Sequence, residues 1–371
     1  MKILLLSAYD AASHQYWREG IVEHIPEHEW TVLTLPARFF SWRVRGNSLT
    51  WAFEQKAILS QHYDLIVATS MADISGLKGL VPSLAHIPTI VYFHENQFAY
   101  PKTEQAFNSV EPQMLSIYSG VAANGLVFNT DFNRQTFLAG ARQLLKKLPD
   151  QVPKGIVESL EAKSHVIAVP IRGCDKQCRE SSNRTQLSVV WNHRWEYDKG
   201  PILLKHIVEK ALLKSLDIKF HIVGQRFRYT PVEFDEIAEL LKQTTSKAVL
   251  GHFGFVESRD AYYQLLRTSD VVLSTAEHDF QGLSILEAVY RGCTPLVPNK
   301  LAYPEILGQQ FCYGQDSMEL DKLAVLAVEK LAVYASRKQA GNSLPKANVE
   351  RFTWPNLIGD YQSIFNEVVN G

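Results

Sequence analysis

Short, continuous runs of apolar residues alternate with amphipathic stretches along almost the whole chain. The first run, Ile3–Ser7, has no polar alternation, which is typical of a parallel strand covered on both faces. Similar runs follow within the first 170 residues at Trp30–Leu35, Asp64–Thr69, Thr89–Phe93, Gly125–Phe128 and Val166–Val169. Helical patterns lie between them, among them Pro112–Ala122 and Arg134–Leu148. This alternation predicts an α/β unit with a parallel, doubly wound sheet.

The same alternation begins again after residue 186. Further strand-like runs are Leu187–Trp191, Lys219–Val223, Val249–Phe255, Val271–Ser274, Pro295–Val297 and Phe311–Tyr313. The segment 172–186 is polar and has no periodicity, so it is interpreted as a linker. A length of 371 residues suits two domains. We therefore expect a Rossmann-like domain over residues 1–171, a linker over 172–186, a second Rossmann-like domain over 187–351, and a final helix within 352–371.

Charge and cysteine content narrow the class of protein. The formal net charge is −1, so no overall basic field points to nucleic acid, although a local basic patch is compatible with it. The four cysteines favour a reduced, cytoplasmic protein. Cys174 and Cys178 could hold a metal, but no second pair with ligand spacing follows, so we expect no metal site. No apolar run approaches spanning length, so we expect no membrane span.

The stretch 275–288 is the clearest candidate site. It follows a strand-like run and leads into a short helical pattern that begins near Leu283. A helix start presents unpaired N–H groups and the positive end of the helix dipole, which suits a phosphate, and Gly282 lets the backbone approach such an anion. Asp279 just outside the helix and Glu287 one turn inside it could hold sugar and ribose hydroxyls. The alternative is a loop acid and a solvated helix glutamate.

Two cations follow the strand-like run that ends at Trp191. Arg194 is forked and Lys199 is compact, and both suit a diphosphate leaving group. In a transferase that uses no metal, such cations neutralise the charge that develops as the sugar departs. The alternative is a pair of ordinary surface cations.

Polar residues also follow the buried run 89–93. His94 follows this run directly, where ligand-contacting residues of such sheets are expected, although a histidine at such a position can also be a satisfied structural residue. Glu95 could act as a base or as a group that orients a neighbour.

The segment 36–45 interleaves aromatic side chains with arginines. Arginine pairs with phosphates, and tryptophan stacks on unpaired bases, which is how single-stranded RNA is recognised. Trp42, Arg43 and Arg45 are therefore candidates for contacts to RNA. A surface loop around a buried tryptophan is the alternative.

The run from Asp279 to Ala288 resembles the Glu-x7-Glu signature of the family 4 retaining glycosyltransferases. In that family the signature reads Glu-x-Phe-Gly-x-x-x-Leu-Glu-Ala, and a small residue, a glycine and a proline follow. Residues 291–296 fit this continuation. The sequence departs from the pattern at Asp279, which is one methylene shorter than the usual glutamate, and at Gln281. The shorter side chain predicts a weaker or water-mediated contact with its hydroxyl.

A narrower resemblance, to the tRNA-queuosine α-mannosyltransferase family, extends over both halves of the chain. It rests on Ser13-His14, Leu35–Arg38 with Trp42–Arg45, Tyr92–Gln97 with Tyr100-Pro101, Phe128–Asn133, Pro170–Arg172, Trp191–Lys199 and Leu286–Tyr290. The resemblance implies transfer of mannose from GDP-mannose to the cyclopentenediol of queuosine in a tRNA anticodon. It also implies the GT-B fold, in which two Rossmann-like domains face each other across a cleft and the last helix returns to the first domain. Ala11 and Ala12 stand where two glycines are expected.

The resemblance implies a role for each candidate residue. The residues for catalysis are His94, Asp279, Arg194 and Lys199. The donor would be bound by Arg194, Lys199, Gly282, Leu283, Ser284, Glu287, Phe255 and Val256. The acceptor would be bound by Ser13, His14, Trp42, Arg43, Arg45, Asn96, Gln97 and Tyr100. The partners are a nucleotide-sugar and tRNA, and no cofactor is expected because the nucleotide-sugar is itself a substrate.

Two other functions fit the same residues. One is a family 4 transferase that uses another nucleotide-sugar and a lipid or glycan acceptor. The other is an RNA-binding module on a degenerate transferase, which Asp279 in place of glutamate could signal. An intact donor site argues against the module.

Overall fold

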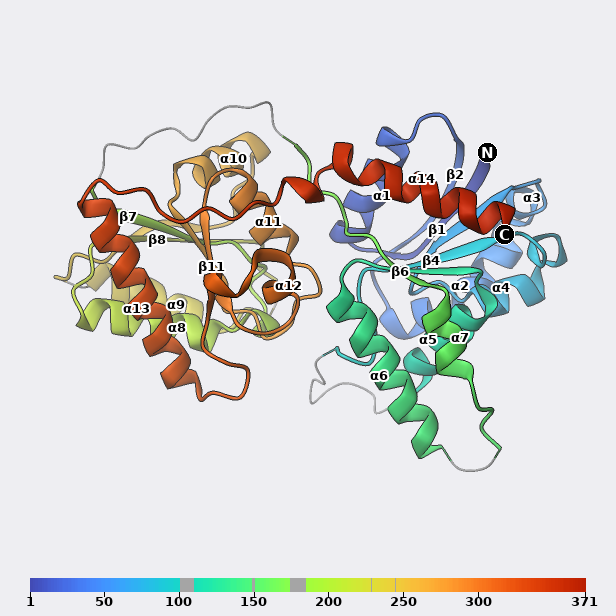
Figure 1. Cartoon of the computed structure of the whole chain (residues 1–371), viewed down its shortest axis with the longest axis horizontal. Coiled ribbons are helices and arrows are strands. Elements are labelled where there is room, and N and C mark those ends of the chain that lie inside the picture. Colours follow the sequence, from blue (N-terminus) through green and yellow to red (C-terminus); the bar gives the residue numbers. More distant parts are fainter. Residues whose placement is uncertain (101–109, 149–150, 174–184, 228, 244) are drawn as a thin grey trace. The chain divides into compact units, whose positions relative to one another are not determined.

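The computed structural model describes residues 1–100, 110–148, 151–173, 185–227, 229–243 and 245–371. These residues form two compact units: unit 1 comprises Met1–Pro170 and Trp354–Gly371, and unit 2 comprises Ile171–Thr353 (Figure 1). Most of the segment that the sequence indicates as a linker, residues 174–184, lies outside the described residues, and so do Cys174 and Cys178.

Unit 1 is built on a six-stranded sheet in which every pair is parallel, as the apolar runs predict. The strands lie in the order β2-β1-β3-β4-β5-β6, with bounds β1 Lys2–Asp10, β2 Glu29–Pro36, β3 Leu65–Thr69, β4 Thr89–Phe93, β5 Gly125–Phe128 and β6 Ser164–Val166. The sequence places the last strand at 166–169, but the structure ends it at Val166. The carbonyls of Ile167 and Ala168 accept hydrogen bonds from two tyrosine hydroxyls instead.

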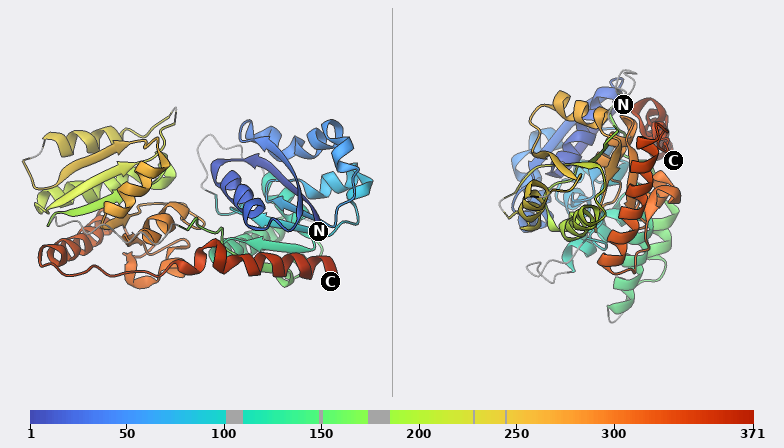
Figure 2. Two further views of the ribbon diagram at one scale, coloured as in Figure 1. Left: turned by 90° about the horizontal axis from the view of Figure 1, so that it is seen from above. Right: turned by 90° about the vertical axis from the view of Figure 1, so that its left-hand side faces the viewer.

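Helices cover both faces of this sheet. Successive side chains of a strand point in opposite directions. In β4, Tyr92 stacks on Trp17 of α1 and on Tyr361 of α14, whereas Phe93 packs on Phe137 of α6. Helices α1 (Ala12–His24) and α14 (Trp354–Asn370) therefore lie on one face (Figures 1 and 2). The core on the other face includes α2 (Phe40–Glu54), α3 (Lys56–Leu59), α4 (Ile74–Leu80), α5 (Glu111–Ala122), α6 (Asp131–Lys147) and α7 (Ile156–Ala162).

Helix α14 is fixed against α1 by specific contacts between their side chains. The indole Nε1 of Trp17 donates to the hydroxyl of Tyr361 at 3.0 Å. The rings of His24 and Trp354 stack with centroids 4.5 Å apart. Gly20 lies under the Trp354 ring, where an added Cβ would come within 2.4 Å of it. The last helix of the chain thus completes the aromatic core on this face of unit 1.

Unit 2 also has a six-stranded parallel sheet, in the order β12-β11-β10-β7-β8-β9. The strands are β7 Leu187–Trp191, β8 Ile218–Val223, β9 Val249–Gly254, β10 Val271–Leu273, β11 Thr294–Pro298 and β12 Cys312–Tyr313. One core contains residues of α8 (Pro201–Leu213), α9 (Glu233–Gln243) and α13 (Leu320–Gln339). Helices α10 (Arg259–Thr268), α11 (Leu283–Tyr290) and α12 (Tyr303–Leu307) lie on the other side of the sheet (Figure 1).

Each sheet has a point at which the strand order reverses. In unit 1 it lies between β1 and β3, and in unit 2 between β7 and β10. Open α/β sheets bind ligands outside the carboxyl ends of the strands at such a point. In unit 2 the loops that follow β7 and β10 therefore define where a site is expected.

Candidate active site

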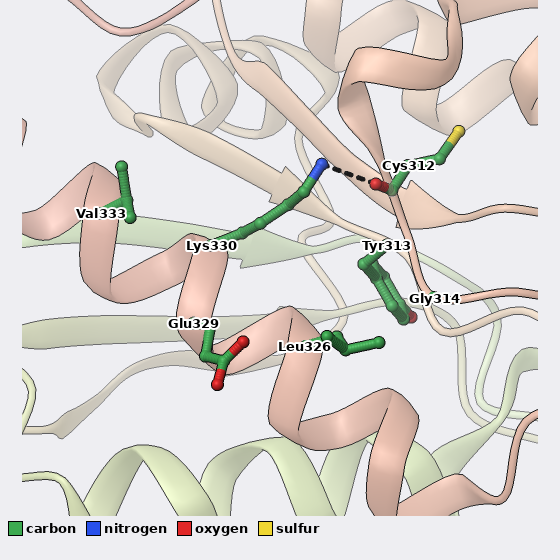
Figure 3. A pocket seen from close by; sticks show the side chains of 7 residues that line it. All are labelled: Cys312, Tyr313, Gly314, Leu326, Glu329, Lys330 and Val333. Atoms are coloured by element: carbon green, nitrogen blue, oxygen red, sulfur yellow. Dashed lines mark hydrogen bonds between the residues drawn. The ribbon is translucent and has the colours of Figure 1, made fainter.

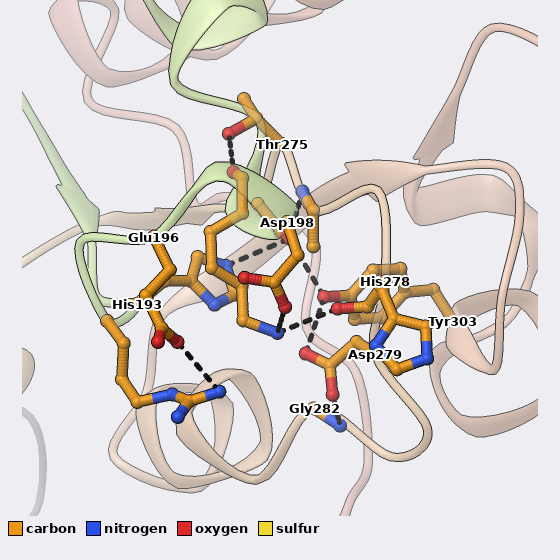
Figure 4. A network of polar contacts seen from close by, with 12 residues as sticks. His193, Glu196, Asp198, Thr275, His278, Asp279, Gly282 and Tyr303 are labelled. Carbon is orange, nitrogen blue, oxygen red and sulfur yellow. Dashed lines mark hydrogen bonds and ion pairs between the residues drawn. The ribbon is translucent and has the colours of Figure 1, made fainter. Parts of the chain in front are cut away.

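In unit 2, the loop 192–200 after β7 and the loop 274–282 after β10 are joined by hydrogen bonds (Figure 4). Thr275 Oγ1 donates to the carbonyl of Lys199 at 2.7 Å, and the N–H of Glu277 donates to the carbonyl of Asp198 at 2.9 Å. Gly200 has a φ of +65°, and a Cβ there would lie 2.0 Å from the Thr275 carbonyl oxygen. Only glycine allows this approach, which brings the two loops together.

Lys199 is buried where these loops meet. Its ammonium donates to the carbonyl of His278 at 2.7 Å and pairs with the Asp198 carboxylate at 3.0 Å. An ammonium held in this way is a fixed positive charge between two loops at the carboxyl edge of the sheet.

Asp279 has a defined partner for each carboxylate oxygen. Oδ1 accepts the N–H of Gly282 at 2.9 Å, and Oδ2 accepts the hydroxyl of Tyr303 at 3.1 Å. Burial alone would raise the pKa of Asp279, but the nearby Lys199 ammonium and these two hydrogen bonds together lower it below its ordinary value. The carboxylate therefore stays ionised.

A chain of hydroxyls connects Asp279 with His193. Tyr303 Oη lies 2.8 Å from Ser274 Oγ, which lies 2.9 Å from Nε2 of His193. Burial and the charge of Lys199 lower the pKa of His193 to about 4, so its imidazole is neutral near pH 7. These hydrogen bonds orient the Asp279 carboxylate at the N-terminus of helix α11.

Helix α11 begins at this network without a side-chain cap. Its N-cap, Gly282, has a φ of +72°, and a Cβ there would lie 2.9 Å from the Tyr303 ring. The N–H of Gly282 is taken by Asp279, whereas those of Leu283 and Ser284 are in the first turn, where no intrahelical acceptor exists. This end of the helix suits an anion.

Arg194 lies on the same loop as Lys199 but is exposed. Its guanidinium pairs with the Glu196 carboxylate at 2.9 Å and lies 5.9 Å from the centre of the Phe227 ring. The structure thus places the two predicted cations on one loop, with one fixed inside it and one on its surface.

Glu287 lies one turn into α11 and is partly buried. Burial raises its pKa above the ordinary value, although the charges of Arg291, Arg259 and Arg172 oppose the shift. Phe255 and Val256 follow β9, and the Phe255 side chain is exposed.

In unit 1, His94 and His14 come together although 80 positions separate them. Their rings lie 4.2 Å apart, and His94 also packs on Trp17 and Tyr92. Both ring nitrogens of His94 are buried and have no hydrogen-bond partner among the described residues. Burial and the charge of His14 lower the pKa of His94 well below its ordinary value, so the ring is neutral.

His14, unlike His94, has a carboxylate partner, Glu95. The distance between His14 Nε2 and Glu95 Oε2 is 3.3 Å. Burial lowers the pKa of His14, but the Glu95 charge and hydrogen bond outweigh it and raise the pKa above its ordinary value. Ala11, just before α1, has a φ of −67°, an ordinary extended conformation that needs no glycine.

The loop after β4 is fixed by Asn96. Its amide nitrogen donates to Asn133 and Thr136, while its oxygen accepts the N–H groups of Phe98 and Ala99. Asn96 therefore shapes the loop through its own side chain. The other acceptor candidates nearby are placed as follows: Gln97 contacts Met71 Sδ, Tyr100 is 49% exposed, and Ser13 is exposed at the start of α1.

The remaining acceptor candidates lie on α2. Trp42 and Arg45 are exposed, and Arg45 forms an ion pair with Glu111. Arg43 is buried instead, and its Nε donates to the carbonyl of Pro36 at 3.1 Å. Arg43 thus holds the turn before α2 together.

Several residues of the network in unit 2 were not predicted as site residues. Ser274, Asn192 and His193 follow buried strands directly, so their positions could have indicated them. Asn192 Nδ2 donates to the carbonyl of Ser284 and thereby holds the start of α11. Tyr303 lies 24 residues beyond Asp279 and has no signal in the sequence.

Across the described ranges, no group of three or more His, Cys, Asp and Glu side chains could hold a metal ion. Within the same ranges, no helix combines the length and apolarity needed to cross a membrane.

A cavity of about 260 Å³ lies between β12 and α13, where Lys330 donates to the carbonyl of Cys312 (Figure 3). It is lined by Cys312, Tyr313, Gly314, Leu326, Glu329, Lys330 and Val333.

Comparison with known proteins matches both units. Residues 2–171 match the family model described as tRNA-queuosine alpha-mannosyltransferase N-terminal, and residues 175–314 match the one described as glycosyl transferases group 1. The chain is 33% identical over 375 residues to the tRNA-queuosine alpha-mannosyltransferase of Drosophila melanogaster, with 98% of this chain and 96% of the relative covered.

Solved structures show the same fold at low sequence identity. A UDP-forming α,α-trehalose-phosphate synthase from Burkholderia xenovorans has a TM-score of 0.68 at 12% identity, with 100% of this chain and 99% of that chain covered. Anabaena Alr3699/HepE, solved with UDP and glucose, has a TM-score of 0.63 at 16% identity, with 99% and 100% covered. The prediction of two doubly wound α/β units of the GT-B class is confirmed.

Proposed function

This chain belongs to the tRNA-queuosine alpha-mannosyltransferase family and is a glycosyltransferase, and on that premise we propose that it transfers mannose from GDP-mannose to the cyclopentenediol of queuosine in a tRNA anticodon. The observation that carries the proposal is the match to the Drosophila relative over 98% of the chain. The proposal includes retention of configuration at the anomeric carbon and a cytoplasmic location.

The donor binds at the loops of unit 2 in this proposal. The diphosphate accepts hydrogen bonds from the first-turn N–H groups of Leu283 and Ser284, and Lys199 and Arg194 neutralise its charge. Lys199 supplies a fixed charge, whereas the exposed Arg194 can swing from Glu196 to the phosphate. The attraction between these two cations and the diphosphate strengthens as the departing diphosphate gains negative charge. An interaction that is stronger in the transition state than in the bound substrate accelerates the reaction.

The sugar and the nucleoside extend to either side of the diphosphate. Asp279 stays ionised, and each of its oxygens keeps lone pairs beyond its present bond, so it can accept sugar hydroxyls. Glu287 accepts the ribose hydroxyls, and Phe255 and Val256 contact the base. His94 is neutral, and its two ring nitrogens have no partner within the described part of the chain, so in this proposal it contacts the sugar near the reacting carbon.

Retention follows from attack on the side of the leaving group. The acceptor hydroxyl gives its proton to the departing phosphate oxygen, the new C–O bond forms, and the bond to the phosphate breaks. Retaining glycosidases instead use a pair of carboxylates, one of them as a nucleophile. The protein then contributes positioning and charge stabilisation, and no cofactor takes part.

The acceptor binds through residues of unit 1. They are Ser13, His14, Trp42, Arg43, Arg45, Asn96, Gln97 and Tyr100. Ser13, Trp42, Arg45 and Tyr100 expose their side chains for direct contact, whereas the bonded Asn96 and Arg43 would act by shaping their loops.

Nucleoside mass spectrometry tests the proposal. The enzyme is incubated with tRNA that contains or lacks queuosine, and with GDP-mannose or UDP-glucose. We expect one added hexose only with GDP-mannose and queuosine-containing tRNA, and removal of that hexose by an α-mannosidase but not by a β-mannosidase. Transfer to a lipid or glycan, transfer from UDP-glucose alone, or RNA binding without nucleotide-sugar binding would contradict it.

A further inference from the structure

Helix α2 exposes a face with two aromatic side chains and one leucine that do not pack into the core of unit 1. Trp42, Leu49 and Phe53 are spaced so that they share one side of the helix, and they are 54%, 43% and 79% exposed. The opposite side buries Val44 and Trp51 in the core of unit 1. Large side chains exposed together in this way mark a surface for interaction.

The ring of Trp42 lies flat against the helix. Gly46, one turn further on, faces the indole so closely that an added Cβ would come within 2.4 Å of it. The ring is nevertheless 54% exposed, so one of its faces contacts the glycine and the other is open. A planar ring held on one face and free on the other is a platform for stacking.

The turn before α2 has a strained backbone at Phe39, whose ring is also exposed. Phe39 has a φ of +53°, a left-handed conformation that is costly for a residue other than glycine, and its side chain is 73% exposed. Its carbonyl accepts the N–H groups of Trp42 and Arg43, which fixes the turn. No burial of the ring compensates for the strain, and such strain is concentrated at functional sites.

The charge around this face is positive. Arg38 lies 5.7 Å from the Phe39 ring, and Arg45 and Lys56 are exposed on the same segment. The exposed acids are Glu54 within the segment and Glu111 of α5, which pairs with Arg45. Aromatic rings interleaved with cations are the means by which proteins bind single-stranded nucleic acid without reading base edges. An apolar protein partner would not require the arginines.

We propose that the α2 aromatic face, which consists of Phe39, Trp42, Arg45, Leu49 and Phe53, stacks on unpaired bases of the acceptor RNA. The proposal rests on the proposed function, since it assumes that the acceptor is RNA. Trp42 lies in the first turn of α2, near the carboxyl edge of the sheet, and α1 with His14 begins at the same edge. Phe53 lies about 16 Å further along α2. The contact therefore extends beyond the modified nucleotide to a run of loop bases.

Binding of a fluorescently labelled, unmodified anticodon stem–loop, measured by anisotropy without donor, tests this inference. Trp42→Ala and Phe53→Ala should each weaken binding roughly tenfold or more. Gly46→Ala should do the same because its Cβ displaces the indole. The matched controls are Gly79→Ala in α4, where a Cβ meets nothing within 4 Å, and Tyr118→Ala, an exposed ring on α5. Neither control should change binding.

The results separate this inference from the proposed function. RNA binding by Trp42→Ala and Phe53→Ala equal to that of the wild type would overturn the inference. So would a wild-type dimer in sedimentation velocity that Trp42→Ala dissociates, because the face would then bind a second copy. Failure of mannose transfer, with binding still dependent on Trp42, would overturn the proposed function alone. Nucleotide binding, measured by calorimetry with GDP, should be the same in every variant.

Discussion

The ammonium of Lys199 donates to the main-chain carbonyl of His278 at 2.7 Å, across the two loops at the reversal point of unit 2. Replacing Lys199 with methionine removes the fixed charge from that position. We expect turnover to fall about 10²–10³-fold, the cost of losing one preorganised electrostatic donor. Steady-state kinetics at saturating tRNA and circular dichroism will measure turnover and folding. Lys205→Met is the control, because Lys205 forms a surface pair with Glu236 and should change neither. Turnover of Lys199→Met within a factor of ten of wild type would contradict the assignment.

Tyr303→Phe tests the chain of hydroxyls behind Asp279. The variant loses the hydrogen bond to Asp279 at 3.1 Å and the contact with Ser274 at 2.8 Å. We expect a loss of about 1 kcal/mol in the free energy of unfolding, together with a lower kcat, since Asp279 is no longer oriented. Tyr63→Phe loses a bond to a main-chain carbonyl in unit 1 and is the control. The prediction fails if both variants lose the same stability and neither loses turnover.

Stability at acid pH should depend on His193. Its pKa is about 4 in the folded protein, whereas that of an unfolded histidine is about 6.5. Below pH 6.5 the unfolded chain therefore takes up a proton that the folded chain does not, so stability falls as the pH drops towards 4. The depression corresponds to about 3 kcal/mol. Urea unfolding of wild type and His193→Gln across this range should show the smaller acid loss in the variant, and parallel curves would refute the shift.

Gly282→Ala should weaken donor binding more than its backbone strain alone predicts. Gly282 has a φ of +72°, and the new Cβ would also press on the Tyr303 ring at 2.9 Å. Gly155, at the start of α7, has a φ of +85° and open space around it, and it is the control. Gly155→Ala should lose about 1–2 kcal/mol of stability because alanine disfavours the left-handed conformation, and it leaves the site unchanged. Calorimetry with GDP-mannose should show a higher Kd for Gly282→Ala only. Equal affinities in the two variants would argue against a phosphate at this helix start.

The pattern of apolar residues predicts the strands and helices because it reflects which side chains are buried. Continuous apolar runs such as 89–93 indicate strands covered on both faces, and the structure forms a parallel strand there. The last strand of unit 1 was misplaced by two to three residues at its ends for a different reason. Its apolar residues continue beyond Val166, but tyrosines from β4 and α14 occupy the carbonyls of that continuation. Partners so distant in sequence leave no local signal.

The candidate residues divide in the same way. Lys199 and Asp279 lie in the loops that follow β7 and β10, and these loops come together because neighbouring parallel strands end at one edge of the sheet. The pairing of His94 with His14 also follows from this rule. The burial of Arg43 does not, because the orientation of α2 about its own axis is set by what Val44 and Trp51 pack against. The distant Tyr303 reaches Asp279 only through the completed fold.

The return of α14 to unit 1 has a consequence for biosynthesis. The chain passes into unit 2 after Pro170 and comes back at Trp354, so unit 2 is an insertion within unit 1. A ribosome that has finished the first sheet has not yet made the helix that packs on Trp17 and Tyr92. The rings of Trp17 and Tyr92 therefore stay incompletely covered until unit 2 and α14 have been translated. The nascent chain thus holds an unfinished apolar surface for as long as it takes to make 183 residues, the span of Ile171–Thr353, and a chaperone that shields aromatic side chains would find its substrate in that interval.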